Sequence, residues 1–295
     1  MELRALRAFV EVVRQGGFSL AAKTVFATQS TVSKAVKQLE EELGLPLLDR
    51  IGHRSTLTSA GEIVYRRAQA MLAERDDLIA ELDELRGLKR GVLRIGLPPI
   101  GSDLLFAPVF AVFRSRYPGV EIQLAEHGSK RLEELVLAGE VDLAGALLPA
   151  SDAFEWQDVR REPIVALVCA DHPLAKRASV ELKTLADLPF ILFETGFALN
   201  PIILDACRQA GFTPAIAARS SQINFIIELV AAKLGVGFLP RMIAQQRKHP
   251  GVQPIGVGEP SMEWRMALIW RRGAYLSQAA KAWLELASDS SRAQF

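Results

Sequence analysis

Six side chains between residues 28 and 37 could recognise a nucleic acid, because they combine short hydroxyls and an amide with two ammonium groups. Hydroxyls and amides can hydrogen-bond base edges, whereas lysines meet phosphates. We expect four of them to face base edges: Gln29, Ser30, Ser33 and Lys34. We expect Thr28 and Lys37 to face phosphates. A polar face is also typical of an ordinary amphipathic surface helix, so this pattern alone leaves that alternative open.

A basic turn follows closely and favours the nucleic-acid interpretation. Residues 47–58 have the pattern of two short extended arms around a turn, and they carry Arg50, His53 and Arg54. Such a hairpin suits a wing that lies along a phosphate backbone, so we expect these three side chains to contact phosphates. The order of helix, turn, helix and wing is that of a winged helix-turn-helix.

Two helices must position these side chains. Ser19 is the expected N-cap of a short helix that ends before Thr28. A second helix is expected from Gln29 or Ser30 to Leu43, because Gly44 and a proline after it end the pattern. Its apolar residues share one face: Val32, Ala35, Val36, Leu39 and Leu43.

Charge is distributed in favour of the same segment. The whole chain of 295 residues has 35 basic and 34 acidic residues and a net charge of +1. Residues 1–39 contain six basic and two acidic residues, a local excess of four positive charges. This excess is small, so we expect salt-sensitive DNA binding that needs more than one such domain.

Several of these residues match a known pattern: Phe9, Ser19–Ala22, Thr28–Ser33, Leu39–Gly44, Arg50 and Leu57–Gly61. In them, and over essentially its whole length, the chain resembles the LysR-type transcriptional regulators. It departs where Ser30 and Leu48 replace the family's usual Pro and Phe. Because Ser30 can also cap the helix, its assignment to DNA is weaker than that of Gln29.

The resemblance implies an α/β protein with an N-terminal winged helix-turn-helix, a long linker helix and a two-lobed α/β effector-binding domain of the periplasmic-binding-protein type. We place the DNA-binding domain at 1–58, the linker and dimerisation helix at 59–90, and the effector-binding domain at 91–295. Lobe I comprises about 91–163 and 268–295, and lobe II about 164–267. The family also implies a homodimer, and a tetramer that bends DNA.

The linker has a heptad pattern with Arg75 as its one break. The apolar positions are Val64, Ala68, Met71, Leu78, Leu82 and Leu85. Such a pattern favours pairing with a second helix, although a helix that packs on its own domain is the alternative.

The remaining residues alternate strand and helix patterns. In the first lobe, strands are expected at 92–96, 120–124 and 143–147 and helices at 103–116 and 129–138. In the second, strands are expected at 164–169, 190–193, 215–219 and 236–239, with a return near 265–270 and an irregular loop at 150–159. Lys233 stands where the family usually has Gly, so that helix should end less abruptly than in relatives.

Ligands of open α/β sheets bind beyond the carboxyl ends of strands, where helix N-termini present free amides. That rule selects Pro99, Ile100, Gly101, Ser102, His127, Gly128, Ser129, Phe193, Glu194, Thr195 and Ser221. For Ser102 and Ser129, helix capping without a ligand is the alternative. In the resembled family these loops hold the inducer, and Thr195 and Ser221 occupy matching positions. We expect a small organic effector and no cofactor; a carboxylate fits the helix ends, whereas Glu194 suits an amine or hydroxyl.

Catalytic or metal chemistry has little support. The four histidines are scattered, and no Gly-rich phosphate loop or nucleophile motif is present. Cys169 and Cys207 could form an oxidant-sensing pair, but ordinary buried thiols are the favoured interpretation.

We therefore expect a cytoplasmic, effector-controlled DNA-binding protein that is not an enzyme. Its expected partners are double-stranded DNA, the effector, copies of itself and, as a further candidate, RNA polymerase, but no membrane. A cytoplasmic solute-binding module whose winged domain contacts a protein is one alternative. An architectural DNA binder with a vestigial cleft is another.

Overall fold

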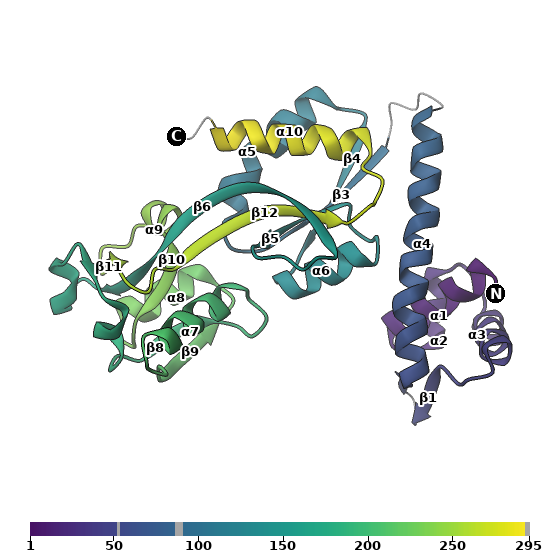
Figure 1. The fold of residues 1–295 in the computed structure, drawn as a ribbon, viewed down its shortest axis with the longest axis horizontal. Coiled ribbons are helices and arrows are strands. Elements are labelled where there is room, and N and C mark those ends of the chain that lie inside the picture. The colour runs from purple at the N-terminus through teal and green to yellow at the C-terminus, as the bar shows by residue number, and fades with distance from the viewer. Residues whose placement is uncertain (52–53, 86–90, 293–295) are drawn as a thin grey trace. The chain divides into compact units, whose positions relative to one another are not determined.

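The computed structural model describes residues 1–51, 54–85 and 91–292. The chain forms two compact units. One comprises Met1–Leu88, Leu135–Val141 and Gly273–Ser277, and the other comprises Lys89–Glu134, Asp142–Arg272 and Gln278–Phe295. Each unit contains its own buried apolar residues. The ribbon in Figure 1 shows the elements of both units.

The first unit is a small helical core with a hairpin and a long helix. Its elements are α1 (Leu3–Gln15), α2 (Phe18–Thr24), α3 (Gln29–Leu43), β1 (Leu48–Ile51), β2 (Arg54–Leu57) and α4 (Ser59–Leu85). Phe9, Val36 and Leu39 are fully buried at its centre. Helix α3 ends where Gly44 turns left-handed (φ 67°), as the sequence predicts. β1 and β2 pair antiparallel, which confirms the expected hairpin.

Two expectations for this unit are wrong. Ser19 lies inside α2, whose N-cap is Gly17, so its hydroxyl does not cap the helix. Leu43 is 38% exposed, because the last turn of α3 extends beyond the core that covers Val32 and Leu39.

The second unit is built from mixed sheets. Its strands are β3 (Gly91–Leu97), β4 (Val120–Glu126), β5 (Leu143–Leu147), β6 (Phe154–Cys169), β7 (Ser179–Val180), β8 (Phe190–Phe193), β9 (Ile216–Ser220), β10 (Gly237–Pro240), β11 (Val252–Val257) and β12 (Glu263–Arg271). Its helices are α5 (Ser102–Arg116), α6 (Ser129–Leu137), α7 (Leu199–Gln209), α8 (Ile223–Ala231), α9 (Arg241–Gln246) and α10 (Gln278–Arg292), with short 3-10 turns η1 (Pro173–Lys176) and η2 (Leu182–Leu185).

The sheet order shows two lobes joined by long strands. The order is β4-β3-β5-β12-β6-β11-β7, with β10 also beside β6, while β8 and β9 pair parallel to each other. We call the end around β3, β4 and β5 the first lobe and the end around β8 to β11 the second lobe. In the first lobe, Trp283 of α10 packs edge-on against Phe110 and Phe113 of α5.

Strand β6 runs through both lobes over 16 residues. Its first half pairs antiparallel with β12, and its second half pairs with β10 and β11 (Figure 1). The expected irregular loop at 150–159 is therefore wrong from residue 154 onward. Its charged residues gave this segment the sequence pattern of a loop. In the structure they pair with one another on the strand, and Arg160 and Glu162 form a 2.7 Å ion pair.

Lys233 does not soften the end of its helix. Helix α8 ends at Ala231, and Lys233 takes the left-handed conformation (φ 65°) that a glycine there would adopt. The expectation of a less abrupt end is wrong, since the lysine adopts the strained turn instead of extending the helix. Its Nζ lies 3.1 Å from a carboxylate oxygen of Asp171.

Candidate functional sites

The exposed face of α3 brings the predicted nucleic-acid contacts together. Thr28, Gln29, Ser30, Lys34 and Lys37 are exposed and Ser33 is half-buried. The opposite side of the helix faces the core, where Val32 and Val36 are at most 1% exposed. One side of the helix is therefore fixed by packing, while the other presents hydroxyl, amide and ammonium groups to solvent.

Local hydrogen bonds organise the first turn of α3. The Thr31 amide donates to Thr28 Oγ1 at 3.2 Å, so Thr28, and not Ser30, is the N-cap. Ser30 Oγ lies 2.9 Å from the same hydroxyl. The Ser19 hydroxyl donates to Gln29 Oε1 at 3.1 Å, which ties the Gln29 side chain to α2. These contacts hold the polar groups in place before any partner arrives.

The predicted wing is the hairpin of β1 and β2, whose backbones pair antiparallel. Arg50 pairs with Ser55 and Ile51 with Arg54 across the β1–β2 hairpin. The side chains of Arg50 and Arg54, and the whole of His53, lie outside the described residues, so their phosphate contacts stay predictions.

The apolar side chains of the predicted heptad pattern on α4 form two groups, one packed against the first unit's core and one exposed. Ala68 is buried and Val64 half-buried against the first unit's core, which agrees with the helix packing on its own domain. Met71, Leu78 and Leu82 are 44–57% exposed. A mostly apolar groove of about 490 Å³ lies beside Met71. Its lining includes Met1, Leu6, Leu43, Ile63, Val64 and Met71.

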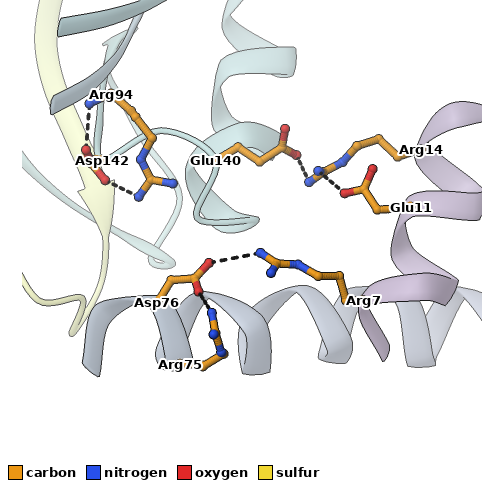
Figure 2. A network of polar contacts seen from close by, with 8 residues as sticks. All are labelled: Arg7, Glu11, Arg14, Arg75, Asp76, Arg94, Glu140 and Asp142. Carbon is orange, nitrogen blue, oxygen red and sulfur yellow. Dashed lines mark hydrogen bonds and ion pairs between the residues drawn. The ribbon is translucent and has the colours of Figure 1, made fainter. Parts of the chain in front are cut away.

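Arg75, the break in that pattern, is engaged locally. Its guanidinium lies 2.5 Å from Asp76 Oδ1, and Arg7 of α1 lies 3.8 Å from the other oxygen of Asp76. Figure 2 shows both arginines directed at this carboxylate. The charge thus stays on the helix surface beside a carboxylate. In the same figure Arg14 donates to Glu11 at 2.8 Å, which pairs a carboxylate that is only 7% exposed.

The second unit contains a small enclosed cavity at the ends of its strands. Its empty space is about 280 Å³ when the open solvent at its mouth is included, but only about 20 Å³ can hold the centre of a water-sized sphere, so in this arrangement it has room for little more than a water molecule. Its wall is mostly apolar: Pro98, Pro99, Ile100, Gly128, Ser129, Leu147, Phe197, Ala198, Leu199, Trp264 and Met266. Among these residues there is no charged side chain, so a ligand's charge would meet helix ends and a hydroxyl.

Four of the predicted effector residues line this cavity, namely Pro99, Ile100, Gly128 and Ser129. Gly101 instead begins α5 with φ 86° and packs close to the Trp264 ring, where a Cβ would lie 2.8 Å from a ring carbon. Ser102 does not cap α5; its hydroxyl donates to the Pro98 carbonyl. The other predicted residues lie outside the cavity wall: His127, Phe193, Glu194, Thr195 and Ser221.

Those outer residues differ in burial. Phe193 is 1% exposed and stacks on Phe197 with ring centroids 5.3 Å apart, which is a packing role. Glu194, Thr195 and Ser221 are exposed. Asn200 holds the loop that carries them, because it accepts from the Phe193 amide at 3.1 Å and donates to the Phe193 carbonyl at 2.9 Å.

Three helix N-termini meet at the cavity. Ile100 precedes α5, Ser129 is the first residue of α6, and Leu199 is the first of α7. Ser129 is only 8% exposed, and its hydroxyl makes no hydrogen bond within the described part of the chain. A hydroxyl that faces a cavity and has no partner within the chain, next to free helix amides, is suited to an anionic or carbonyl oxygen.

Sequence reasoning missed the cavity residues from distant strands. Trp264 and Met266 of β12 form part of the wall and are at most 1% exposed. They lie more than 130 residues beyond Ser129, and no local motif marks them. The signal that could have found them is the return of the chain near residue 265, which places β12 between β5 and β6.

The two lobes touch at the rim of the cavity. A Cβ on Gly128, after β4, would lie 3.1 Å from the carbonyl oxygen of Gly196, after β8. Arg247, after α9, donates to Asp103 of α5 at 2.7 Å and to Asn224 at 2.9 Å. These contacts join the first lobe to the second, so the cavity is closed in this structure.

The two cysteines differ in burial. Cys207 is fully buried in α7, and burial raises the pKa of its thiol from 9.0 to about 11. Cys169 is half-buried, with its sulfur 3.8 Å from the Ala231 carbonyl oxygen. Both are free thiols.

Two further searches cover the described residues only. No cluster of three or more His, Cys, Asp or Glu side chains that could hold a metal ion occurs among them. Within the same residues, no helix is long and apolar enough to cross a membrane.

Comparison with known proteins identifies the family of two parts of the chain. Residues 3–62 match the family "Bacterial regulatory helix-turn-helix protein, lysR family", and residues 86–292 match "LysR substrate binding domain". The Bacillus subtilis regulator YwbI is 40% identical over 97% of this chain and 95% of its own length. The transcriptional dual regulator GltC of the same species is 32% identical over 97% and 96%. A structure of full-length OxyR from Pseudomonas aeruginosa matches with TM-score 0.75 and 26% identity, covering 99% and 95% of the two chains.

Proposed function

Since the chain belongs to the LysR family of transcriptional regulators, we propose that a small effector in the closed cavity of the second unit controls how the α3 face binds DNA. The observation that carries the proposal is Ser129, a residue that is 8% exposed and whose hydroxyl makes no hydrogen bond within the described part of the chain, in a cavity where three helices begin. An effector can act only by binding one arrangement of the protein more tightly than another.

The proposed effector is a small carboxylate with a compact apolar body. Its carboxylate would accept hydrogen bonds from Ser129 and from amides at the start of α6 and α7. Its body would pack against Trp264, Met266 and Phe197. The mostly apolar wall supports a molecule of this polarity over a highly charged one, and the two lobes would have to separate to admit it, because the cavity now has room for little more than a water molecule.

On DNA, the proposed base contacts are Gln29, Ser30, Ser33 and Lys34. The proposed phosphate contacts are Thr28, Lys37, Arg50, His53 and Arg54. The exposure of the α3 residues supports this assignment, because groups that reach into a major groove must project from a helix that is held from behind.

The working form we propose is a homodimer that assembles further into a tetramer. Exposed Met71, Leu78 and Leu82 on α4 support pairing, since a chain rarely leaves such a row of apolar side chains in water. Two DNA-binding domains would also compensate for the small local charge excess. RNA polymerase is a further proposed partner, and DNA binding places the protein in the cytoplasm. No catalytic step is part of this function.

The test joins ligand binding to DNA binding in one protein. The full chain is screened by thermal shift against a panel of small carboxylates, amines and alcohols. Each hit is then used in footprinting on a duplex that the wild-type protein selects from a random-sequence library. We expect a carboxylate to raise Tm and to change the footprint. Ligand binding with no DNA binding would instead indicate a solute-binding module, and DNA binding with no ligand response would indicate a vestigial cleft.

A matched pair of variants locates the effector. Ser129→Ala should weaken effector binding about fivefold to thirtyfold, in line with the loss of about 1–2 kcal/mol for one hydrogen bond to a charged group. Ser151→Ala is the control, because Ser151 is exposed and lies outside the cavity wall. Equal effector affinity in both variants would remove the effector from this cavity while leaving the DNA assignment intact.

The oxidant-sensing alternative has less support. A thiol with a pKa of about 11 is almost fully protonated at neutral pH and reacts slowly with peroxides. We therefore do not assign regulation to Cys169 and Cys207. An oxidant-dependent footprint that disappears in the Cys169→Ser, Cys207→Ser double variant would reverse this choice.

A further inference from the structure

Phe26 is unusual in two respects. It lies between α2 and α3, and its side chain is 98% exposed, the highest value among the large apolar side chains described as exposed. It also has a positive φ of 53°, a conformation that side chains with a Cβ rarely adopt. Exposure and backbone strain each cost free energy, so the isolated domain gains nothing evident from a phenylalanine here.

The surroundings of Phe26 indicate what kind of surface it meets. Between residues 12 and 39 the sequence has four basic residues and no acidic one. Lys23 precedes Phe26 on α2 and is exposed, and the exposed Thr28 and Gln29 follow it. The aromatic ring thus projects from a positively charged surface that is continuous with the first turn of the DNA-reading helix.

We propose that Phe26 is an additional DNA-contact residue, whose ring packs against deoxyribose or a thymine methyl group at the edge of the groove that α3 enters. DNA offers apolar groups of both kinds beside its phosphates, so one surface can satisfy the ring and the neighbouring lysines together. Burial against DNA would recover the free energy that exposure costs in the free protein.

The geometry of the turn supports this role. The Phe26 amide donates to the Lys23 carbonyl at 3.3 Å, and the Ala27 amide donates to the Ala22 carbonyl at 2.9 Å. These bonds fix the backbone on both sides of the ring. The left-handed turn therefore projects the side chain outward from a rigid base, so little ordering is required when DNA binds.

The experiment uses the full chain and separates contact with DNA from protein stability. Affinity is measured on a duplex selected by the wild-type protein from a random-sequence library, and Tm is measured without DNA. Phe26→Gly relieves the positive φ, and Phe26→Asn tolerates it. We expect both variants to keep or raise Tm and to bind the duplex about tenfold more weakly. Phe26→Tyr, which keeps the ring, should bind within about twofold of wild type.

The control is Phe225→Ala, which removes another exposed aromatic ring, 52% exposed on α8 of the second unit. It should leave DNA affinity unchanged. Unchanged affinity in Phe26→Gly and Phe26→Asn would overturn the proposal. If those variants lost transcription activation while keeping DNA affinity, the ring would face a protein such as RNA polymerase, and the proposal would again be wrong. If Phe26→Gly and Phe26→Asn lowered both Tm and DNA affinity, the ring would have a structural role, and this result would also overturn the proposal.

Discussion

Thr28, Gln29 and Ser30 stand exposed on the first turn of α3, whereas Ser129 in the second unit is 8% exposed behind apolar walls. The same kinds of polar group are displayed in one unit and concealed in the other. DNA brings a large polar surface of its own, so the groups that read it must already project. A small ligand offers few groups and is held by enclosure, so its site must open before it can bind.

The largest expected effect tests whether the exposed polar face of α3 depends on the buried core of the first unit. Leu39→Ala removes a fully buried side chain of α3 and should destabilise the first unit by about 2–5 kcal/mol. Leu20→Ala, at a residue that is 53% exposed on α2, should change stability by less than about 0.5 kcal/mol. Urea denaturation followed by circular dichroism measures both. Equal losses would mean that the displayed face is not held by that core.

The second prediction concerns the concealed unit. With a pKa of about 11, Cys207 should react with iodoacetamide at pH 8 about a hundredfold more slowly than an unperturbed thiol. Because this pKa is raised above the ordinary 9.0, its contribution to stability is complete below pH 9 and is lost as pH rises toward 11. Mass spectrometry of native and urea-unfolded protein measures the labelling. Rapid labelling of the native protein would show that α7 is not packed as described.

The third prediction tests whether Gln29 contacts DNA bases or is only an exposed residue of α3. Gln29→Ala should cost about 1–3 kcal/mol on the selected duplex and little on random DNA, because it removes a base contact. Gln38→Ala is the matched control, since Gln38 is also exposed on α3 but lies nine residues further on, on the opposite side of the helix. Gel-shift titrations measure both. Equal losses on specific and random DNA would assign Gln29 to the backbone.

The smallest effect tests how the concealed site stays closed. Asp103→Asn removes the charge that pairs with Arg247 between the lobes, and should change effector affinity by less than about fivefold, because partly exposed pairs contribute at most about 1 kcal/mol. High salt should abolish the difference. Asp205→Asn breaks a pair within α7 and should leave effector affinity unchanged. Calorimetric titration of each variant with the effector at two salt concentrations measures these affinities. A change in affinity that does not depend on salt would exclude this ion pair as the cause.

Sequence alone predicted the displayed site far better than the concealed one. The limits of α3 followed from Gly44, and its polar and buried faces followed from helical spacing, because both are local properties. The cavity required strands from distant parts of the chain, so Pro99, Ile100, Gly128 and Ser129 were found through the strand-end rule, while Trp264 and Met266 were not. The return of the chain near residue 265 indicated a strand there, but not that this strand lies between β5 and β6 at the cavity.

Strand β12 also determines when the second unit can be completed during synthesis. It lies between β5 and β6 but is encoded at residues 263–271, more than 90 residues after β6 ends. Among the described residues, the hydrophobic core of the first unit draws on residues 5–72. Local contacts form early and distant pairings late, so a nascent chain should complete helix α3 well before the cavity of the second unit has a wall.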